Sequence, residues 1–339
     1  MSIVTNLTTA QIAALSTAQI AALGTADISG LNSAQFQALT TNQIGALTTG
    51  QVGALTTTQL ASVITTNQVV ALTSVQVGAL RSAQVANLST NAIAALETAD
   101  LAAIKTNAIS GLNTAQIAAL STNQVSSLST SQIAGLKTVQ MSGLTTNQVV
   151  AMTSTQLGAL STSQFSSLST AAIGAIETAD IGALKTNVIA GLKSAQLGAL
   201  TTNQVVALST LQASSLTSAQ LSGLSTNAIA ALETADLAAI KSNAIAGLGT
   251  AQIAALSTNQ VGSLSTSQIA GLKTDQMSGL TTNQVVAMSS TQLGALSTAQ
   301  FGALSTAAIG AIETADIAGL KTSVIAGLKS AQLVGLSTN

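Results

Sequence analysis

Hydroxyl, carboxylate and amine side chains are the groups of this sequence that could take part in chemistry. Ser and Thr recur throughout, but a hydroxyl needs a base beside it to act as a nucleophile, and the sequence contains no His and no Cys. No local Lys–Ser pattern stands out, and the glycines are scattered instead of forming a phosphate-binding loop. We therefore expect no enzyme activity, no catalytic residue, no cofactor and no small-molecule substrate.

Four Glu-Thr-Ala-Asp segments bring two carboxylates close together in sequence, and a metal site is the chemistry that such segments could support. They begin at Glu97, Glu177, Glu233 and Glu313. A carboxylate in the first turn of a helix is also stabilised by the helix dipole. We prefer this structural explanation and expect no metal.

The composition excludes several classes of protein. The 339 residues include only nine Lys plus Arg and ten Asp plus Glu, with a formal net charge of −1, so no basic surface is available for nucleic acid. Charged residues make up 6% of the chain, against about 25% in an average globular domain, while 47% are hydrophobic. Such a chain is too apolar to be a solvated disordered polymer.

Targeting and membrane signals are not recognisable. Residues 1–15 contain no Lys or Arg, and therefore do not resemble a secretory signal peptide. Polar clusters interrupt every apolar stretch before it could span a bilayer. We expect no membrane-spanning segment.

The chain is built from a unit of eight residues, here called an octad, of which Ser16 to Leu23 is a clear copy. About 41 octads follow one another from Thr8 to Leu336, and one extra residue, Ile64, is the only change of phase. Position five of the octad is a large apolar residue except at Ala213, and position eight is Leu, Ile or Met. These two positions define the buried side.

The spacing inside the octad predicts a short helix. Positions five and eight are three residues apart, which places them on one face of a helix but on opposite faces of a strand. Ser or Thr at position one with Gln or Asp at position four is the capping-box pattern that starts a helix. A new start after every Leu implies that each helix ends within about two turns.

Helices this short are unstable alone because nucleation is costly, so we expect them to stack on their neighbours. The predicted fold is all-α, a solenoid of very short capped helices with one helix per eight-residue repeat. A β-solenoid is the alternative, because Thr, Val and Ile favour strands and stacked Asn or Gln can form ladders. The Ala content, the odd spacing and the recurrent capping box favour helices.

Charges are restricted to the first half of the octad. All nine basic residues and all four Glu occupy position one, and Asp occupies position four except at Asp275. We expect this edge of the helices to remain in water. Lys cannot accept the capping hydrogen bond, so helices that begin with Lys should have weaker starts. Each Glu octad is followed by a Lys octad, as Glu97 is by Lys105, and we expect these side chains to pair, contributing about 0 to 1 kcal/mol.

A longer repeat is superimposed on the octads. Asn91 to Gly111 returns nearly unchanged as Asn227 to Gly247, an offset of 136 residues or 17 octads. This super-repeat runs over about 89–224 and 225–339, and a segmental duplication explains it. No Pro, linker or charge run marks a boundary, so we predict a single domain over 1–339.

Two resemblances follow from these residues. Leu144 to Met152 resembles the opening helix of transcription-activator-like effector repeats, which supports a capped helix but not DNA binding, because the two-helix unit and its base-reading loop are absent. The whole chain resembles the low-complexity Ser/Thr/Ala-rich octapeptide-repeat arrays of bacterial surface and secreted fibrous proteins. That resemblance implies a structural or adhesive role.

We therefore expect a structural protein, a building block of an extracellular filament or cell-surface layer that assembles through its repetitive faces. A contact between identical copies that does not close on itself propagates. The expected partner is thus the protein itself, and the expected location is extracellular or at the cell surface. The alternatives are an adhesin stalk, an ice-binding or surface-binding solenoid that uses Ser and Thr ladders, an intracellular scaffold and a designed consensus array.

Overall fold

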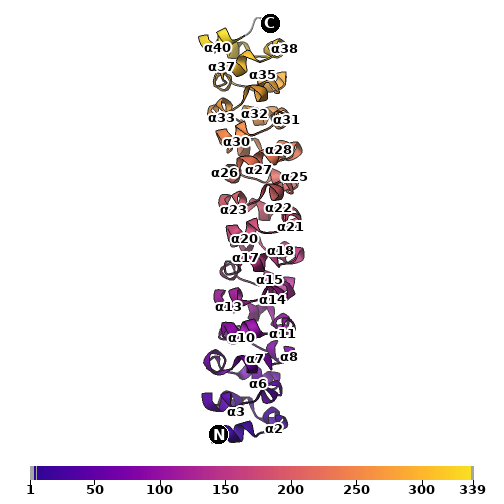
Figure 1. Ribbon diagram of the computed structural model, residues 1–339, viewed down its shortest axis with the longest axis vertical. Helices are drawn as coiled ribbons and strands as arrows, with labels where there is room; N and C mark the ends of the chain where they lie inside the picture. Colours follow the sequence, from indigo (N-terminus) through magenta and orange to yellow (C-terminus); the bar gives the residue numbers. More distant parts are fainter. Residues whose placement is uncertain (1–3, 5, 337–339) are drawn as a thin grey trace. The chain divides into compact units, whose positions relative to one another are not determined.

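The computed structural model describes residue 4 and residues 6–336, and within them it contains short helices and no strand. From Thr8 onward each octad forms one helix, so the predicted all-α solenoid is confirmed and the β-solenoid alternative is wrong. Figure 1 shows the helices of each unit following one another in sequence order around a coil.

The chain divides into two compact units, Met1–Ala172 and Ile173–Asn339. The first contains one π-helix, η1 (Gln59–Val63), and the α-helices α1 (Thr9–Ala13), α2 (Thr17–Ala22), α3 (Thr25–Ser29), α4 (Ser33–Gln37), α5 (Thr41–Gly45), α6 (Thr49–Ala54), α7 (Thr66–Val70), α8 (Ser74–Val77), α9 (Ser82–Ala86), α10 (Thr90–Ala95), α11 (Thr98–Ala103), α12 (Thr106–Ile109), α13 (Thr114–Ala119), α14 (Thr122–Ser127), α15 (Thr130–Ala134), α16 (Thr138–Met141), α17 (Thr146–Val150), α18 (Ser154–Ala159) and α19 (Thr162–Phe165). Helix α20 (Thr170–Gly174) contains the division.

The second unit contains the helices α21 (Thr178–Ala183), α22 (Thr186–Ala190), α23 (Ser194–Gly198), α24 (Thr202–Val206), α25 (Thr210–Ser214), α26 (Ser218–Gly223), α27 (Thr226–Ala231), α28 (Thr234–Ala239), α29 (Ser242–Ile245), α30 (Thr250–Ala254), α31 (Thr258–Ser263), α32 (Thr266–Ala270), α33 (Thr274–Ser278), α34 (Thr282–Val286), α35 (Ser290–Ala295), α36 (Thr298–Phe301), α37 (Thr306–Gly310), α38 (Thr314–Ile317), α39 (Thr322–Ala326) and α40 (Ser330–Gly335). The two units do not coincide with the super-repeat over about 89–224 and 225–339. The single domain over 1–339 stays a prediction.

The capping box starts the helices as predicted. In α14 the backbone N–H of Gln124 donates to Ser121 Oγ at 3.2 Å, and the Ser121 N–H donates to Gln124 Oε1 at 2.8 Å. The helix ends at Leu128, whose extended backbone (φ −63°, ψ 139°) leads into the next octad. The octad therefore contains both the start and the end of its helix.

Helices that begin with Lys lack the side-chain half of this box. Lys137 makes no capping hydrogen bond with its side chain, but its backbone N–H still donates to Gln140 Oε1 at 2.7 Å. Lys105 begins an octad that also lacks Gln, and the helix that follows it, α12, has only four residues. Helix α16, which follows Lys137 and keeps its Gln, also has four residues, so the weaker start of Lys octads stays a prediction.

The core consists of the apolar residues at positions five and eight. Val125 and Leu128 in one octad are 0% and 4% exposed, and the same two positions are buried through most of both units. The largest fully buried side chains include Phe36 and Phe165 in the first unit and Phe301 in the second. The predicted buried side is confirmed.

Within each unit a helix contacts the helix three places later along the chain. Pairs such as α10 with α13, α15 with α18, α25 with α28 and α32 with α35 pack in this way. Consecutive helices therefore point in different directions around the coil. The helix three places later along the chain therefore belongs to the next layer of the solenoid.

Most Gln residues at position four connect their octad to the one four octads earlier. Gln148 Nε2 donates to the carbonyl oxygens of Ile117 and Leu120 at 2.8 and 2.6 Å, while its Oε1 accepts the Thr145 N–H at 2.8 Å. Gln260 does the same in the second unit, with Ile229 and Leu232 as acceptors at 3.2 and 2.7 Å. We call this arrangement the glutamine bridge. Together with the helix contacts, it shows that one turn of the coil takes between three and four octads.

The one change of phase is a π-helix. In η1 the Ile64 N–H donates to the Gln59 carbonyl oxygen at 2.8 Å, which accommodates one additional residue in a single wide turn. Gln59 still forms its own glutamine bridge, to Ile28 and Leu31 at 2.9 and 3.3 Å. The extra residue therefore widens one helical turn, while the start of this helix keeps its glutamine bridge to the earlier layer.

Small residues at positions six and seven allow the close approach of neighbouring layers. A Cβ added to Gly182 in α21 would lie 2.8 Å from the carbonyl oxygen of Ala207, whereas a Cβ added to Gly158 would meet no atom within 4 Å. Both glycines occupy position six. The requirement for Gly at this position therefore depends on the neighbour and not on the helix itself.

Replacing Gln148 with Glu tests the glutamine bridge, because Glu keeps the acceptor for Thr145 but loses the donors for the two carbonyls. We expect a loss of unfolding free energy of about 3 kcal/mol at pH 7, since a buried carboxylate would face carbonyl oxygens. Burial against the carbonyl oxygens raises the pKa of this Glu in the folded state above its unfolded value of about 4.3. The loss of unfolding free energy is therefore complete above the folded pKa and diminishes as the pH falls and the carboxylate becomes protonated. Chemical denaturation at pH 7 and pH 4 measures it. Gln11→Glu, at an exposed position, is the control and should cost less than about 1 kcal/mol.

Replacing the two glycines with Ala tests the close approach. Gly158→Ala should raise the unfolding free energy by about 0.5 to 1 kcal/mol, because Ala favours the helix and meets no neighbour. Gly182→Ala should lower it by about 1 to 3 kcal/mol, because the layers must move apart. Urea denaturation of the two variants checks this. Equal changes in both would show that the layers at Gly182 are not held in close contact.

Candidate functional site

Four groups of three consecutive octads depart from the repeat because none of them carries Gln at position four. We call them the variant triplets; they begin at Ser89, Ser169, Ser225 and Ser305. Each consists of a Ser octad, a Glu octad and a Lys octad. In the first, Ala92, Asp100 and Ala108 replace the Gln, so the octads over residues 56–80 receive no glutamine bridge.

Asp at the centre of a triplet makes a different connection between layers. Asp100 Oδ1 accepts a hydrogen bond from Ser74 Oγ at 2.6 Å, and Asp316 accepts one from Ser290 in the same way. Asp100 is only 5% exposed and Asp236 only 3%. The expectation that this edge stays in water is therefore wrong for these two carboxylates. Position four faces the neighbouring layer, which covers it.

The Glu-Thr-Ala-Asp segments do not gather further ligands. Each places Glu at the start of a helix and Asp within its first turn, as at Glu97 and Asp100 in α11. In the described part of the chain, His, Cys, Asp and Glu form no group of three or more that could hold a metal ion. Glu97 adds negative charge to the surface, and Asp100 forms a hydrogen bond to the neighbouring layer.

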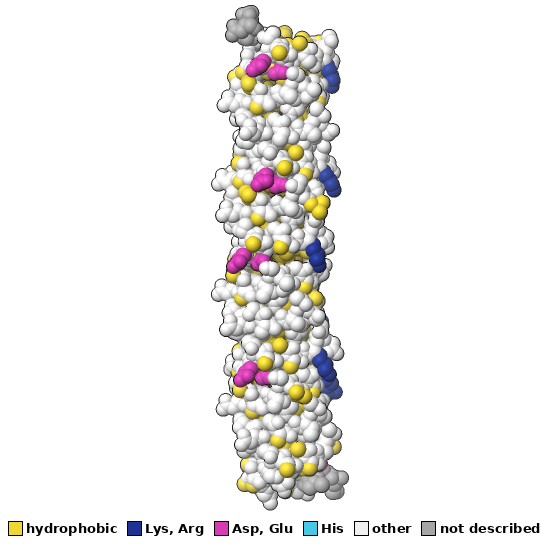
Figure 2. Space-filling view, turned by 90° about the vertical axis from the view of Figure 1, so that its right-hand side faces the viewer, with side chains coloured by type: hydrophobic (Ala, Val, Ile, Leu, Met, Phe, Trp, Pro, Cys, Tyr) yellow, Lys and Arg dark blue, Asp and Glu magenta, His cyan; other side chains and the backbone are white. Residues whose placement is uncertain are grey.

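Acidic and basic side chains lie on different sides of the coil. Figure 2 shows small acidic groups that recur along one face of the second unit, while basic side chains follow a separate edge. A Lys octad is turned by between a quarter and a third of a turn from the Glu octad before it, because a full turn takes three to four octads. This separation argues against the predicted contact between each Glu and the next Lys.

Two depressions lie beside Lys residues of the variant triplets. One has a volume of about 670 Å³ and lies beside Lys105, and the other, of about 320 Å³, lies beside Lys241. The second lies between the Lys241 octad and the octad four places earlier, and Ala244, at position four, lines it. In this second depression, Ala244 leaves open the space that a Gln side chain would fill.

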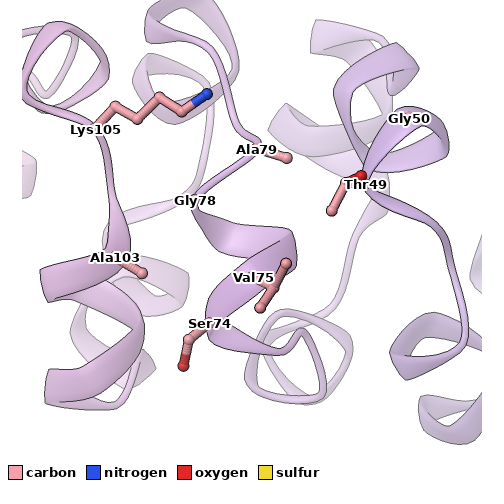
Figure 3. Close-up of a pocket in the computed structure, with 8 residues that line it drawn as sticks. All are labelled: Thr49, Gly50, Ser74, Val75, Gly78, Ala79, Ala103 and Lys105. Carbon is pink, nitrogen blue, oxygen red and sulfur yellow. The ribbon is translucent and has the colours of Figure 1, made fainter.

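The larger depression offers few groups for chemistry. Figure 3 shows Lys105 and Ala103 on one side, Thr49 and Gly50 on the other, and the helix that carries Ser74 and Val75 between them. Its remaining lining residues are Gly78 and Ala79. One amine and two hydroxyls face a mostly apolar surface, and the Ser74 hydroxyl already donates to Asp100. No carboxylate lines the depression to work with the amine.

The first and last described octads leave the repeated contacts unfilled. Gln11 and Gln19 are exposed, and within the described residues their Nε2 atoms donate to no carbonyl, although their Oε1 atoms accept the Thr8 and Ser16 N–H groups. At the other extreme Leu333, at position five, is 48% exposed, whereas Leu197 at the same position is 0% exposed. Within the described residues, no layer covers the donors at Gln11 and Gln19 or the apolar surface at Leu333.

The capping role of Gln follows from the octad pattern, but its contact with the earlier octad was not predicted. Glu would satisfy the same capping box, yet Glu occurs only at position one of the octads and never at position four. A pattern that accepts Gln but not Glu indicates that an amide donor is needed as well as an acceptor. The absence of Glu from position four could therefore have predicted the contact between Gln and the earlier octad.

No helix of the described residues is long and apolar enough to cross a bilayer. No match to a curated protein was found. The ALTTAQ repeat family matches the chain repeatedly, over residues 4–33, 20–57, 62–90, 93–130, 133–170, 173–210, 229–266, 253–282, 261–290, 269–306 and 309–339. Since these matches cover most of the sequence, the chain belongs to the ALTTAQ repeat family.

Proposed function

We propose that this protein is a non-enzymatic structural element, the building block of an extracellular filament or cell-surface layer. Membership of a repeat family supports a repeat-based structural role. The observation that carries the finer proposal is the open glutamine bridge at Gln11 and Gln19. The same contact is made many times inside the chain, so a second copy would supply a matching surface.

Within the described residues, the Gln side chains of the first octads find no acceptors and the carbonyl groups of the last octads find no Gln donors. Within the described residues, the carbonyl oxygens of positions five and eight in the last four octads, residues 305–336, receive no glutamine bridge. The exposed apolar surface at Leu333 lies in the same region. Stacking the first octads of one copy on the last octads of another would satisfy both sets of groups. Because this contact joins different surfaces, each added copy again presents both free surfaces, and repetition of the stacking builds a filament.

Electron microscopy and light scattering of the purified 339-residue chain test this proposal. We expect fibres whose length grows with protein concentration. The Q11E/Q19E variant should form no fibres, because Glu keeps the capping acceptor but places a carboxylate against the carbonyl oxygens of the next copy. A monodisperse wild-type chain at high concentration would contradict the proposal.

A matched control separates this effect from the added charge. Gln37 and Asn42 are exposed and lie away from the bridging position, so Q37E/N42D adds the same two negative charges. This control should assemble like the wild type. Circular dichroism of both variants should show the same helix content, because neither pair of substitutions disturbs a buried contact.

An adhesin stalk or an ice-binding or surface-binding solenoid is the second candidate. It is favoured by the exposed hydroxyls at position two, such as Thr202 and Thr226. The hydroxyls at position one, such as Ser225, accept a backbone N–H and are therefore already engaged in capping. Thermal hysteresis in solutions of monomeric protein would favour this candidate over the filament.

A further inference from the structure

We infer that copies of this protein also associate side by side, with the Glu side of one copy against the Lys side of the next. The inference rests on the proposed function, because it concerns how assembled copies contact one another. It adds a second, lateral contact to the end-to-end stacking. The occupant of each charged side is thus a second copy of the same chain.

The Glu side of the second unit is built by the variant triplets. Glu177, Glu233 and Glu313 are exposed at the starts of α21, α28 and α38. Their intervals are 56 and 80 residues, or seven and ten octads. Seven and ten octads correspond to two and three turns of the coil if each turn takes roughly 3.4 octads. Figure 2 shows the acidic groups recurring along one face, as this correspondence requires.

The Lys side follows the same intervals. Lys185, Lys241 and Lys321 each begin the octad after a Glu octad and are exposed. Because the coil turns by a quarter to a third between consecutive octads, these Lys residues lie on a different edge from the Glu residues. Figure 2 shows basic side chains along an edge beside the acidic face. The two sides therefore carry opposite charge at equal spacing along the second unit.

Equal spacing allows every Glu of one copy to meet a Lys of its neighbour when the two copies run parallel. A two-fold pairing centred on either charged side would place like charges together, which is unfavourable. The favoured contact therefore joins the Glu side of one copy to the Lys side of the other. A single exposed ion pair contributes little, but several pairs between the same two copies act together. Charged residues make up only 6% of this chain, so few other charged side chains could form alternative ion pairs between the copies.

Sedimentation velocity of the Q11E/Q19E chain tests the lateral contact, because this background blocks end-to-end stacking. We expect oligomers in about 0.02 M salt and a self-association constant lower by roughly tenfold or more in about 0.5 M salt, where exposed charges are screened. Monomers at both salt concentrations would overturn the lateral contact, whatever fibres the wild type forms. Failure of the wild type to form fibres would overturn the end-to-end proposal separately.

A charge exchange gives the sharper result. In the same background, E177K/E233K/E313K makes both sides basic and K185E/K241E/K321E makes both sides acidic, so each variant alone should stay monomeric in low salt. An equimolar mixture should associate again. Position one accepts Glu and Lys in the natural sequence, and equal circular dichroism spectra will show that the fold is kept. If the mixture stays monomeric, or if either variant associates as strongly as the parent, the charged sides are not the contact.

Discussion

Every part of this structure depends on finding hydrogen-bond donors for the carbonyl groups at the ends of very short helices. A helix leaves its last four carbonyl groups without internal partners, so in helices of four to six residues these groups are the majority. Water can serve those on the outside, but the coil buries the ends that face the next layer. The glutamine bridge supplies the donors, as when Gln148 reaches Ile117 and Leu120. Without it the buried ends would carry unsatisfied polar groups.

The same amide also determines the geometry of the coil. Its Oε1 is held by the start of its own helix and its Nε2 by the end of a helix four octads earlier, so two layers are held in one register. Apolar burial at positions five and eight stabilises the stack but tolerates sliding, since the effect has no direction. Hydrogen bonds with fixed distances do not tolerate it. The register of the solenoid therefore depends on a polar side chain in its interior.

The sequence was sufficient to predict the helices, their starts and their buried side, because each follows from spacing within one octad. Ser121 with Gln124 gives the capping box, and Val125 with Leu128 gives the apolar face. The number of octads per turn could not be predicted in this way, because it depends on contacts between residues about thirty positions apart. The burial of Asp100 and the depressions beside Lys105 and Lys241 were missed for the same reason. They arise where one layer lies on another.

The π-helix at Gln59–Val63 bears on how such an array can change its length during evolution. The octad that contains it is one of those that receive no amide, since Ala92 stands at the fourth position of the octad four places later. A single inserted residue there shifts carbonyl groups that no partner had to reach. In the octads that a Gln does reach, the same insertion would separate donor from acceptor. Insertion or deletion of a whole octad keeps this geometry, so related genes should differ in length by multiples of eight residues. Single-residue insertions should be confined to octads whose partner four octads later carries Ala, Val or Asp at position four.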